Sequence, residues 1–220
     1  MNGEQLVAEV MDIVQDGSVD ADAVLALLNQ GQIAVASRVL LPGLSDGNST
    51  VTTLTDGYLV DLPVDYHREL FLAQVDGRKV PVYANKMLLM EELGLSGIGL
   101  STGTIYGVTT NGKQLLYQMV PVAAKDIELF YYRLPAAIAE TTASYPDGLT
   151  THGATNDHFD WALIHYAASH LFSKIEDGME GQKVNTQHHA GMFEGRVAEI
   201  ESATGRGRPR PAPPICGVNW

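Results

Sequence analysis

The chain has 220 residues, a mass of 23.7 kDa and a formal net charge of −12 at pH 7, and Cys216 is its one cysteine. A chain of this length can bury a hydrophobic core without metal ions or disulfides, and a single cysteine excludes an intrachain disulfide. The acidic excess argues against a surface that grips the phosphate backbone of nucleic acids, and the absence of ~18 consecutive apolar residues or a basic, apolar leader argues against membrane insertion and secretion.

Two amphipathic helices are predicted in the first 43 residues. The apolar positions of the first are Leu6, Val10 and Ile13. Gly17-Ser18 ends this run, and Asp20 then stands where the N-cap of a second helix is expected. The second helix ends before Pro42-Gly43. Its apolar stripe consists of Val24, Leu28, Gly31, Val35 and Val39.

The middle of the chain changes to a strand-like pattern. From Ser49 the hydrophobic period is about two, and β-branched and aromatic residues become frequent. The dipeptides typical of hairpin turns are Asp56-Gly57, Asp76-Gly77 and Asn111-Gly112. A short helix from Asn85 to Leu93 interrupts the strands, and IELFYYRLP is the last of them. Residues 49–134 therefore predict a compact antiparallel β domain.

A long helix is predicted from Asp157 to Ile175, with apolar residues on two opposite sides. One side carries Phe159, Leu163 and Tyr166, and the other carries Trp161, Ile164, Ala168, Leu171, Phe172 and Ile175. Such a helix is either central in a bundle or shared between its own subunit and a neighbour. The residues that we assign to packing between subunits are Trp161, Ile164, Leu171 and Phe172.

A last helix carries Phe193, Val197 and Ile200 on one stripe and ends at Gly205. The predicted fold class is α+β: an antiparallel helical bundle from the N- and C-terminal segments, an inserted antiparallel β domain and an extended C-terminal arm. The boundaries place N-terminal bundle helices at 1–48, the β domain at 49–134, C-terminal bundle helices at 135–204 and the arm at 205–220.

The arm, GRGRPRPAPPICGVNW, combines prolines and arginines with apolar residues at its very end. Glycine and proline exclude a helix or a central strand here, proline lowers the entropy lost on binding, and arginines can pair with acidic side chains of a partner. We interpret it as a docking arm; a flexible terminus without a role, with Cys216 an inert thiol, is the alternative. Its candidate contact residues are Arg206, Arg208, Arg210, Ile215, Val218 and Trp220.

Six of the seven histidines lie between His152 and His189, which raises the question of an imidazole metal site. One polar strip of the long helix consists of His158, His165, Ser169 and Glu176. His170 lies on the far side of that helix, and neither a cysteine nor an HExxH-like spacing supports metal binding. The pattern favours a solvated strip with ordinary packing histidines. We therefore predict neither a metal nor a cofactor.

Catalytic motifs are not recognisable in the sequence. The glycine-rich segment from Gly94 to Gly107 precedes a strand-like run and lacks GK[ST], so it reads as a flexible loop and not as a phosphate-binding loop. No GxSxG elbow occurs. The paired carboxylates Asp61 with Asp65 and Asp126 with Glu128 flank strand boundaries, where charged side chains are common. We predict that the chain is not an enzyme.

Several stretches, taken in order, resemble the head-to-tail adaptor (connector) proteins of tailed bacteriophages, which include tail tubular and tail accessory proteins. LLNQGQIAVASRVLLPGL is similar to their opening helix and proline stop. GYLVDLPVDYHRELFLAQVDG is similar to their strand, Leu-Pro-x-Asp-aromatic step and following strand. IELFYYRLPAAI and DHFDWALIHYAASHLFSKIED are similar to their last strand and penultimate helix. The resemblance covers residues 20–202, and no catalytic residue carries over with it.

This resemblance implies a structural virion protein, made in the host cytoplasm, that forms a ring of twelve copies between the portal protein and the next tail or nozzle protein. Genomic DNA would pass through the ring without specific binding, and no membrane is involved. The portal is then the expected partner of the C-terminal arm, because similar adaptors often reach into it with their C-terminal segments. The alternatives from other classes are a virion-associated cell-wall hydrolase, which would need a cleft with a perturbed acid, and a host-surface binding module.

Overall fold

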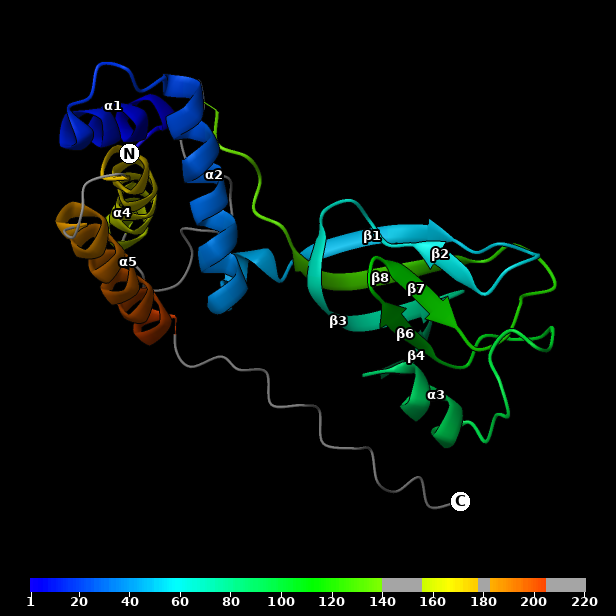
Figure 1. The fold of residues 1–220 in the computed structure, drawn as a ribbon. Helices are drawn as coiled ribbons and strands as arrows, with labels where there is room; N and C mark the ends of the chain where they lie inside the picture. Colours follow the sequence, from blue (N-terminus) through cyan, green and yellow to red (C-terminus); the bar gives the residue numbers. More distant parts are fainter. Residues whose placement is uncertain (140–155, 178–182, 205–220) are drawn as a thin grey trace. The chain divides into compact units, whose positions relative to one another are not determined.

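Figure 1 shows a computed structural model of the chain, in which residues 1–139, 156–177 and 183–204 are described. These residues contain five α-helices and two four-stranded sheets, so the protein is α+β, as predicted. Two compact units divide the chain: Met1–Gly43 with Pro135–Trp220, which we call the helical unit, and Leu44–Leu134, which we call the β unit. Within the described residues, no helix combines the length and the apolar character needed to cross a membrane.

The helical unit is built from both ends of the chain. Its helices are α1 (Gly3–Val14), α2 (Ala21–Arg38), α4 (Asn156–Ile175) and α5 (Val184–Ala203). Helix α4 packs against the other three, and α1 also packs against α2 (Figure 1). A capping box of Asn2 and Gln5 begins α1. Asp20 occupies the N-cap position of α2, as predicted, although its side chain makes no capping hydrogen bond.

The predicted stripe of α2 is confirmed, since all five of its residues are buried. Gly31 lies where α2 crosses α4. A Cβ at this position would lie 3.1 Å from Cδ1 of Tyr166 and 3.3 Å from Cδ2 of Leu163, closer than most side chains approach. The absence of a side chain at Gly31 therefore lets α2 and α4 come close together.

The segment after the last strand is tied to α2 by side-chain amides. The Asn29 side chain donates to the Ile138 carbonyl at 3.0 Å and accepts from the Ile138 amide at 2.7 Å. Gln32 donates to the Ala136 carbonyl at 3.3 Å. These bonds satisfy backbone groups of an irregular segment, which helps to fix Ala136–Ile138 on the helical unit.

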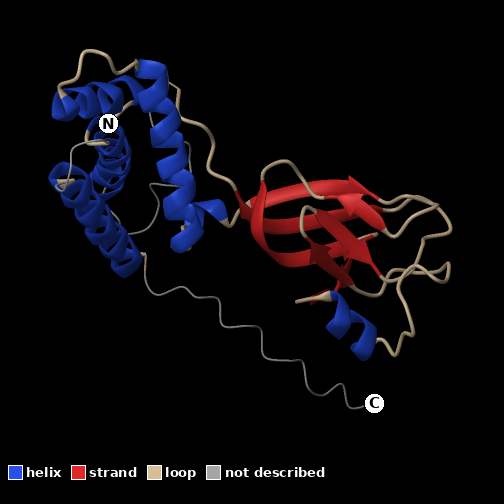
Figure 2. Cartoon of the chain, in the orientation of Figure 1, coloured by secondary structure: helices blue, strands red, loops and turns tan. Residues whose placement is uncertain are grey.

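The β unit consists of two sheets that share one core (Figure 2). One sheet has the order β1 (Gly47–Thr52), β8 (Asp126–Arg133), β3 (Tyr66–Val75), β4 (Arg78–Val80). The other has the order β2 (Leu59–Asp61), β7 (Gln114–Tyr117), β6 (Val108–Asn111), β5 (Val82–Tyr83). The 3₁₀ turn η1 (Pro42–Leu44) precedes them, and α3 (Lys86–Glu92) follows β5. The core residues shared by both sheets include Ala73, Ile127, Leu129, Leu115 and Tyr117.

Two of the three predicted hairpins are confirmed. Strands β3 and β4 pair antiparallel around Asp76-Gly77, and both of these residues have positive φ, as a tight primed turn requires. Strands β6 and β7 pair antiparallel around Gly112, whose φ is 62°. The short helix predicted from Asn85 to Leu93 is also present, with the Asn85 side chain accepting from the Leu88 amide as an N-cap.

The hairpin predicted at Asp56-Gly57 is wrong. Strand β1 pairs with β8, whereas β2 pairs with β7 in the other sheet, so the chain crosses between sheets at this point. The expectation of a purely antiparallel domain also needs correction, because β5 pairs with β6 in parallel. Both differences have one cause: a turn dipeptide reports local backbone preference, whereas distant strands decide which sheet a strand joins.

Candidate functional site

Helix α4, which carries the residues predicted to pack between subunits, is covered by helices of its own subunit. Ile164 and Leu171 are 0% and 4% exposed and therefore belong to the core of the helical unit. Trp161 and Phe172 are half-buried. Of the two placements open to a helix with two apolar sides, the structure shows the central one. A contact with a neighbouring subunit stays a prediction, and it now rests on Trp161 and Phe172.

Two histidines face each other between α4 and α5. The Nδ1 atoms of His165 and His189 are 3.0 Å apart, and the two side chains are 6% and 9% exposed. Only one of the two nitrogens can donate in such a bond, so the neutral rings hold opposite tautomers. The ring of Phe172 stacks on His189 with centroids 5.3 Å apart, and the ring of Trp161 lies 5.6 Å from His165. The half-buried aromatics therefore enclose the histidine pair.

The environment favours neutral imidazoles. Burial, followed by the positive charges of His189, Arg196 and His188, lowers the pKa of His165 to about 4. Burial and the charge of His188 also lower the pKa of His189. If both rings were protonated, two N–H donors would face each other without an acceptor. The two facing Nδ1 atoms of His165 and His189 can therefore hold only one proton between them.

Two of the four residues of the polar strip, His165 and Glu176, are buried, which corrects the prediction of a solvated strip. Glu176 is 6% exposed, and its carboxylate lies at the N-terminus of α5. It accepts from the amides of Asn185 and Thr186 at 3.1 and 3.2 Å and from the Thr186 hydroxyl at 2.7 Å. These bonds, that from the hydroxyl first, lower the pKa of Glu176. Since Lys183 makes no side-chain cap, Glu176 serves as the cap of α5.

The helical unit is expected to lose stability as the pH falls from about 7 to about 5. The pKa of His165 is about 4 in the folded chain and near 6.5 when unfolded, so the unfolded state binds the proton first. The stabilising contribution is complete above about pH 6.5 and is lost progressively as the pH falls toward 4. At pH 5 the loss in the free energy of unfolding is about 2 kcal/mol. Urea unfolding followed by circular dichroism across this range measures it.

The matched variants for this pH dependence are His165→Leu and His170→Gln. His170 is an exposed histidine on the same helix, so His170→Gln controls for the replacement of a histidine outside the buried pair. His165→Leu is expected to flatten the slope whatever it does to stability at neutral pH. An equal slope in wild type and His165→Leu would contradict the assignment.

A metal site finds no support in the described side chains, among which no three histidine, cysteine or acidic residues come together to hold an ion. Nδ1 of His158 instead lies 2.8 Å from a carboxylate oxygen of Glu199, and Arg196 contacts the same carboxylate at 2.7 Å. His152 lies outside the described residues.

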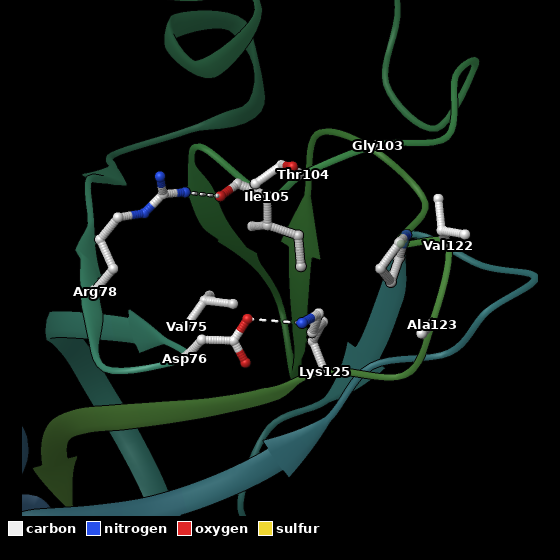
Figure 3. A pocket seen from close by; sticks show the side chains of 10 residues that line it. Val75, Asp76, Arg78, Gly103, Thr104, Ile105, Val122, Ala123 and Lys125 are labelled. Atoms are coloured by element: carbon white, nitrogen blue, oxygen red, sulfur yellow. Dashed lines mark hydrogen bonds and ion pairs between the residues drawn. The ribbon is translucent and has the colours of Figure 1, made fainter.

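A cavity of about 500 Å³ opens in the β unit (Figure 3). Arg78 donates to the Ile105 carbonyl at 3.3 Å, and Lys125 pairs with Asp76 at 2.7 Å on its wall. The remaining lining residues are Val75, Gly103, Thr104, Pro121, Val122 and Ala123. The only carboxylate on its wall is thus already paired, and this cavity does not offer the free acid that a hydrolase needs.

The paired carboxylates considered from the sequence lie elsewhere. Asp65 accepts from the Tyr131 hydroxyl at 2.6 Å, and Asp61 accepts from Gln114 at 3.0 Å. Asp126 accepts from Thr52 at 2.8 Å, and Glu128 is exposed on the same strand. None of the four lines the cavity. The hydrogen bonds of Asp61, Asp65 and Asp126 to neighbouring side chains fit structural roles.

The residues of the predicted docking arm, from Arg206 to Trp220, lie outside the described residues. The described chain ends at Thr204, whose amide and hydroxyl both donate to the Ile200 carbonyl and close α5. The arm therefore follows directly from the end of a capped helix. Its interpretation rests on its sequence.

Comparison with protein families gives a match to the SU10 adaptor protein family over residues 1–213. The chain belongs to this family. The predicted resemblance to phage head-to-tail adaptors is thereby confirmed, and membership suggests a structural role at the connection between phage head and tail. A comparison with curated proteins gives no match.

Membership of the adaptor family indicates which kind of residue is functional in this chain. An adaptor is a virion component that interacts with portal and tail proteins, so its functional residues are those that contact other proteins. Sequence reasoning missed the contact between His165 and His189 and the capping role of Glu176. A signal for the cap was present, because the first turn of α5 carries no acidic residue of its own and Glu176 directly follows the preceding helix.

Proposed function

We propose that this adaptor forms a ring of twelve copies that joins the portal vertex of a phage head to the tail and continues the DNA channel. The observation that carries the proposal is the family match over residues 1–213. The net charge of −12 supports it, because an acidic lining repels DNA and lets it slide. Ring closure and multivalent docking supply the strength that each single contact lacks.

In this ring, the four long helices of each subunit form a bundle, and the β unit is a domain inserted between them in the sequence. The half-buried rings of Trp161 and Phe172 contact the neighbouring subunit, since they keep apolar surface beside α5. The arm reaches the portal, where Arg206, Arg208 and Arg210 pair with acidic side chains and Ile215, Val218 and Trp220 fill apolar pockets.

The β unit faces the downstream tail or nozzle protein. Three loop residues with aliphatic side chains are largely exposed: Leu54 by 51%, Leu100 by 75% and Val122 by 81%. The loops are braced by backbone bonds, from Val120 to the Ser101 carbonyl at 3.0 Å and from Thr53 to the Lys125 carbonyl at 2.8 Å. Exposed aliphatic side chains on braced loops fit docking to another protein, because little entropy is lost on binding.

The decisive experiment is electron microscopy of assembled particles with antibody labelling of this chain. We expect label at the head–tail junction and twelvefold rotational symmetry in the labelled layer. Label elsewhere on the particle would reject the junction role. A different symmetry at the junction would reject only the number of copies.

The purified adaptor is expected not to shift duplex DNA in a gel at physiological salt. Its acidic excess disfavours binding to phosphates, which is the dominant sequence-independent term in DNA affinity. A chain truncated after Thr204, which lacks the three arginines of the arm, serves as the control. If the full chain binds DNA tightly and the truncated chain does not, the arm governs contact with nucleic acid.

A further inference from the structure

The two sheets of the β unit have corresponding edges. Strands β1 and β2 are the first strands of the two sheet orders, and β4 and β5 are the last. Strand β1 contacts β2, and β3, the neighbour of β4, contacts β5. We call the first pair of strands the leading edge and the second pair the trailing edge. Each is an end at which a sheet can be extended by another chain.

Strand β1 of the leading edge lacks the features that normally protect a sheet edge. Strand β1 has the sequence GNSTVT, with neither charge nor proline. Its six residues pair with β8 without a register shift, from Gly47 opposite Tyr131 to Thr52 opposite Asp126. Among the described strands, none pairs with its outer side. A regular, uncharged edge of this length is a template for strand addition.

The trailing edge is protected against pairing with itself. Strand β4 has only three residues, and Arg78 and Lys79 are exposed on it. Pro81 follows directly and has no amide hydrogen to donate. Two copies of this edge would bring like charges together, which disfavours a symmetric contact.

The charges of the two edges are opposite. On the leading side, Asp56, Asp61 and Asp126 are exposed, with Lys113 nearby. On the trailing side, the exposed cations are Arg78, Lys79 and Lys86, with Glu91 and Glu92 at the far end of α3. Four further charges are neutralised locally, because Asp46 pairs with Arg133 and Asp76 with Lys125. A leading edge therefore complements a trailing edge better than it complements itself.

Strand direction also fits a head-to-tail contact. The order β1-β8-β3-β4 is antiparallel at every step, so β1 and β4 run in opposite directions. If two copies stand side by side in the same orientation, β4 of one runs antiparallel to β1 of the next. A contact between two different edges is heterologous, which is the type of contact that a closed ring of identical subunits requires.

We infer that the leading edge of one copy docks on the trailing edge of the next, with β1 and β4 joined by backbone hydrogen bonds. The occupant of the open edge is thus a second copy of this chain. The inference rests on the proposed ring and adds to it which surfaces make the subunit contact. It extends the packing between subunits from the helices to the β unit.

Disulfide trapping tests this contact in a Cys216→Ser background. Thr50→Cys and Lys79→Cys, on exposed positions of β1 and β4, are combined in one chain. Neighbouring registers are covered by Asn48→Cys or Thr52→Cys with the same partner. Oxidation of assembled particles and of the concentrated purified chain is expected to give a ladder of covalent multimers in at least one register. Thr50→Cys with Lys113→Cys is the matched control, which is expected to stay monomeric.

Two outcomes would overturn the inference. Covalent dimers from Thr50→Cys alone would show that β1 pairs with β1 about a twofold axis. No ladder in any register, in particles and in the purified chain, would show that these edges do not meet. If particles contain a ring of this chain at the junction but give no cross-links, the edge contact is rejected and the proposed function stands. If the chain is absent from the junction, the proposed function is rejected, and cross-linking of the purified chain still tests the edge contact.

Charge reversal gives an independent readout. Arg78→Glu with Lys79→Glu is expected to lower the fraction of assembled chain in sedimentation by at least about tenfold. Adding Asp56→Lys and Asp61→Lys to the same chain is expected to restore assembly, because the two edges are again complementary. Circular dichroism verifies that each variant is folded. Folded reversal variants that assemble like the wild type would contradict the inference.

Discussion

A chain truncated after Thr204 is expected to fold normally and to fail to attach stably to heads that contain the portal. Truncation at this point keeps the bonds of Thr204 to the Ile200 carbonyl, so α5 retains its C-terminal cap. The loss removes the three arginines and the terminal tryptophan, the groups best suited to anchor the arm on a partner. Co-sedimentation of adaptor with purified heads, beside thermal melting of the free chain, measures both effects.

Single substitutions separate the parts of the arm. Trp220→Ala is expected to weaken attachment by about tenfold or more, because a buried tryptophan is among the strongest anchors of an interface. Asn219→Ala is the matched control beside it. Replacement of Arg206, Arg208 and Arg210 by glutamine is expected to remove the salt dependence of attachment. Normal attachment of the truncated chain would reject the docking interpretation and favour the alternative, a terminus without a role.

Ile164→Ala and Leu171→Ala are each expected to destabilise the helical unit by about 3 kcal/mol. Both side chains are buried in the core around α4, and their truncation removes apolar contacts and leaves a cavity. Ile164→Val is the matched control and is expected to cost about 1 kcal/mol. Urea unfolding at neutral pH measures the differences in the free energy of unfolding.

Trp161→Ala and Phe172→Ala test the predicted packing of α4 against a neighbouring subunit. Both side chains are half-buried against the histidine pair, so part of their apolar surface is free for a neighbouring subunit. We expect these variants to lose less stability than Ile164→Ala and to assemble more weakly in sedimentation. Normal assembly of both folded variants would remove α4 from the subunit contact.

The sequence alone determined the elements whose causes are local. The buried stripe of α2, from Val24 to Val39, follows from residues spaced along one helix. The turn at Asp76-Gly77 follows from two residues that tolerate positive φ, and Asn85 marks the start of α3 as an N-cap. The order of such fragments along the chain was enough to predict the adaptor family, which the match over residues 1–213 confirms.

Only the tertiary structure decided how distant segments meet. Asp56-Gly57 looks like a hairpin, yet β1 and β2 join different sheets because β8 and β7, much later in the chain, provide their partners. The sequence places His165 and Glu176 on a strip that was predicted to be solvated. In the structure α5 covers them, so that His189 contacts His165 and the amides of Asn185 and Thr186 donate to Glu176. Spacing within one helix tells which residues share a face, whereas the element that covers that face is chosen by packing over the whole unit.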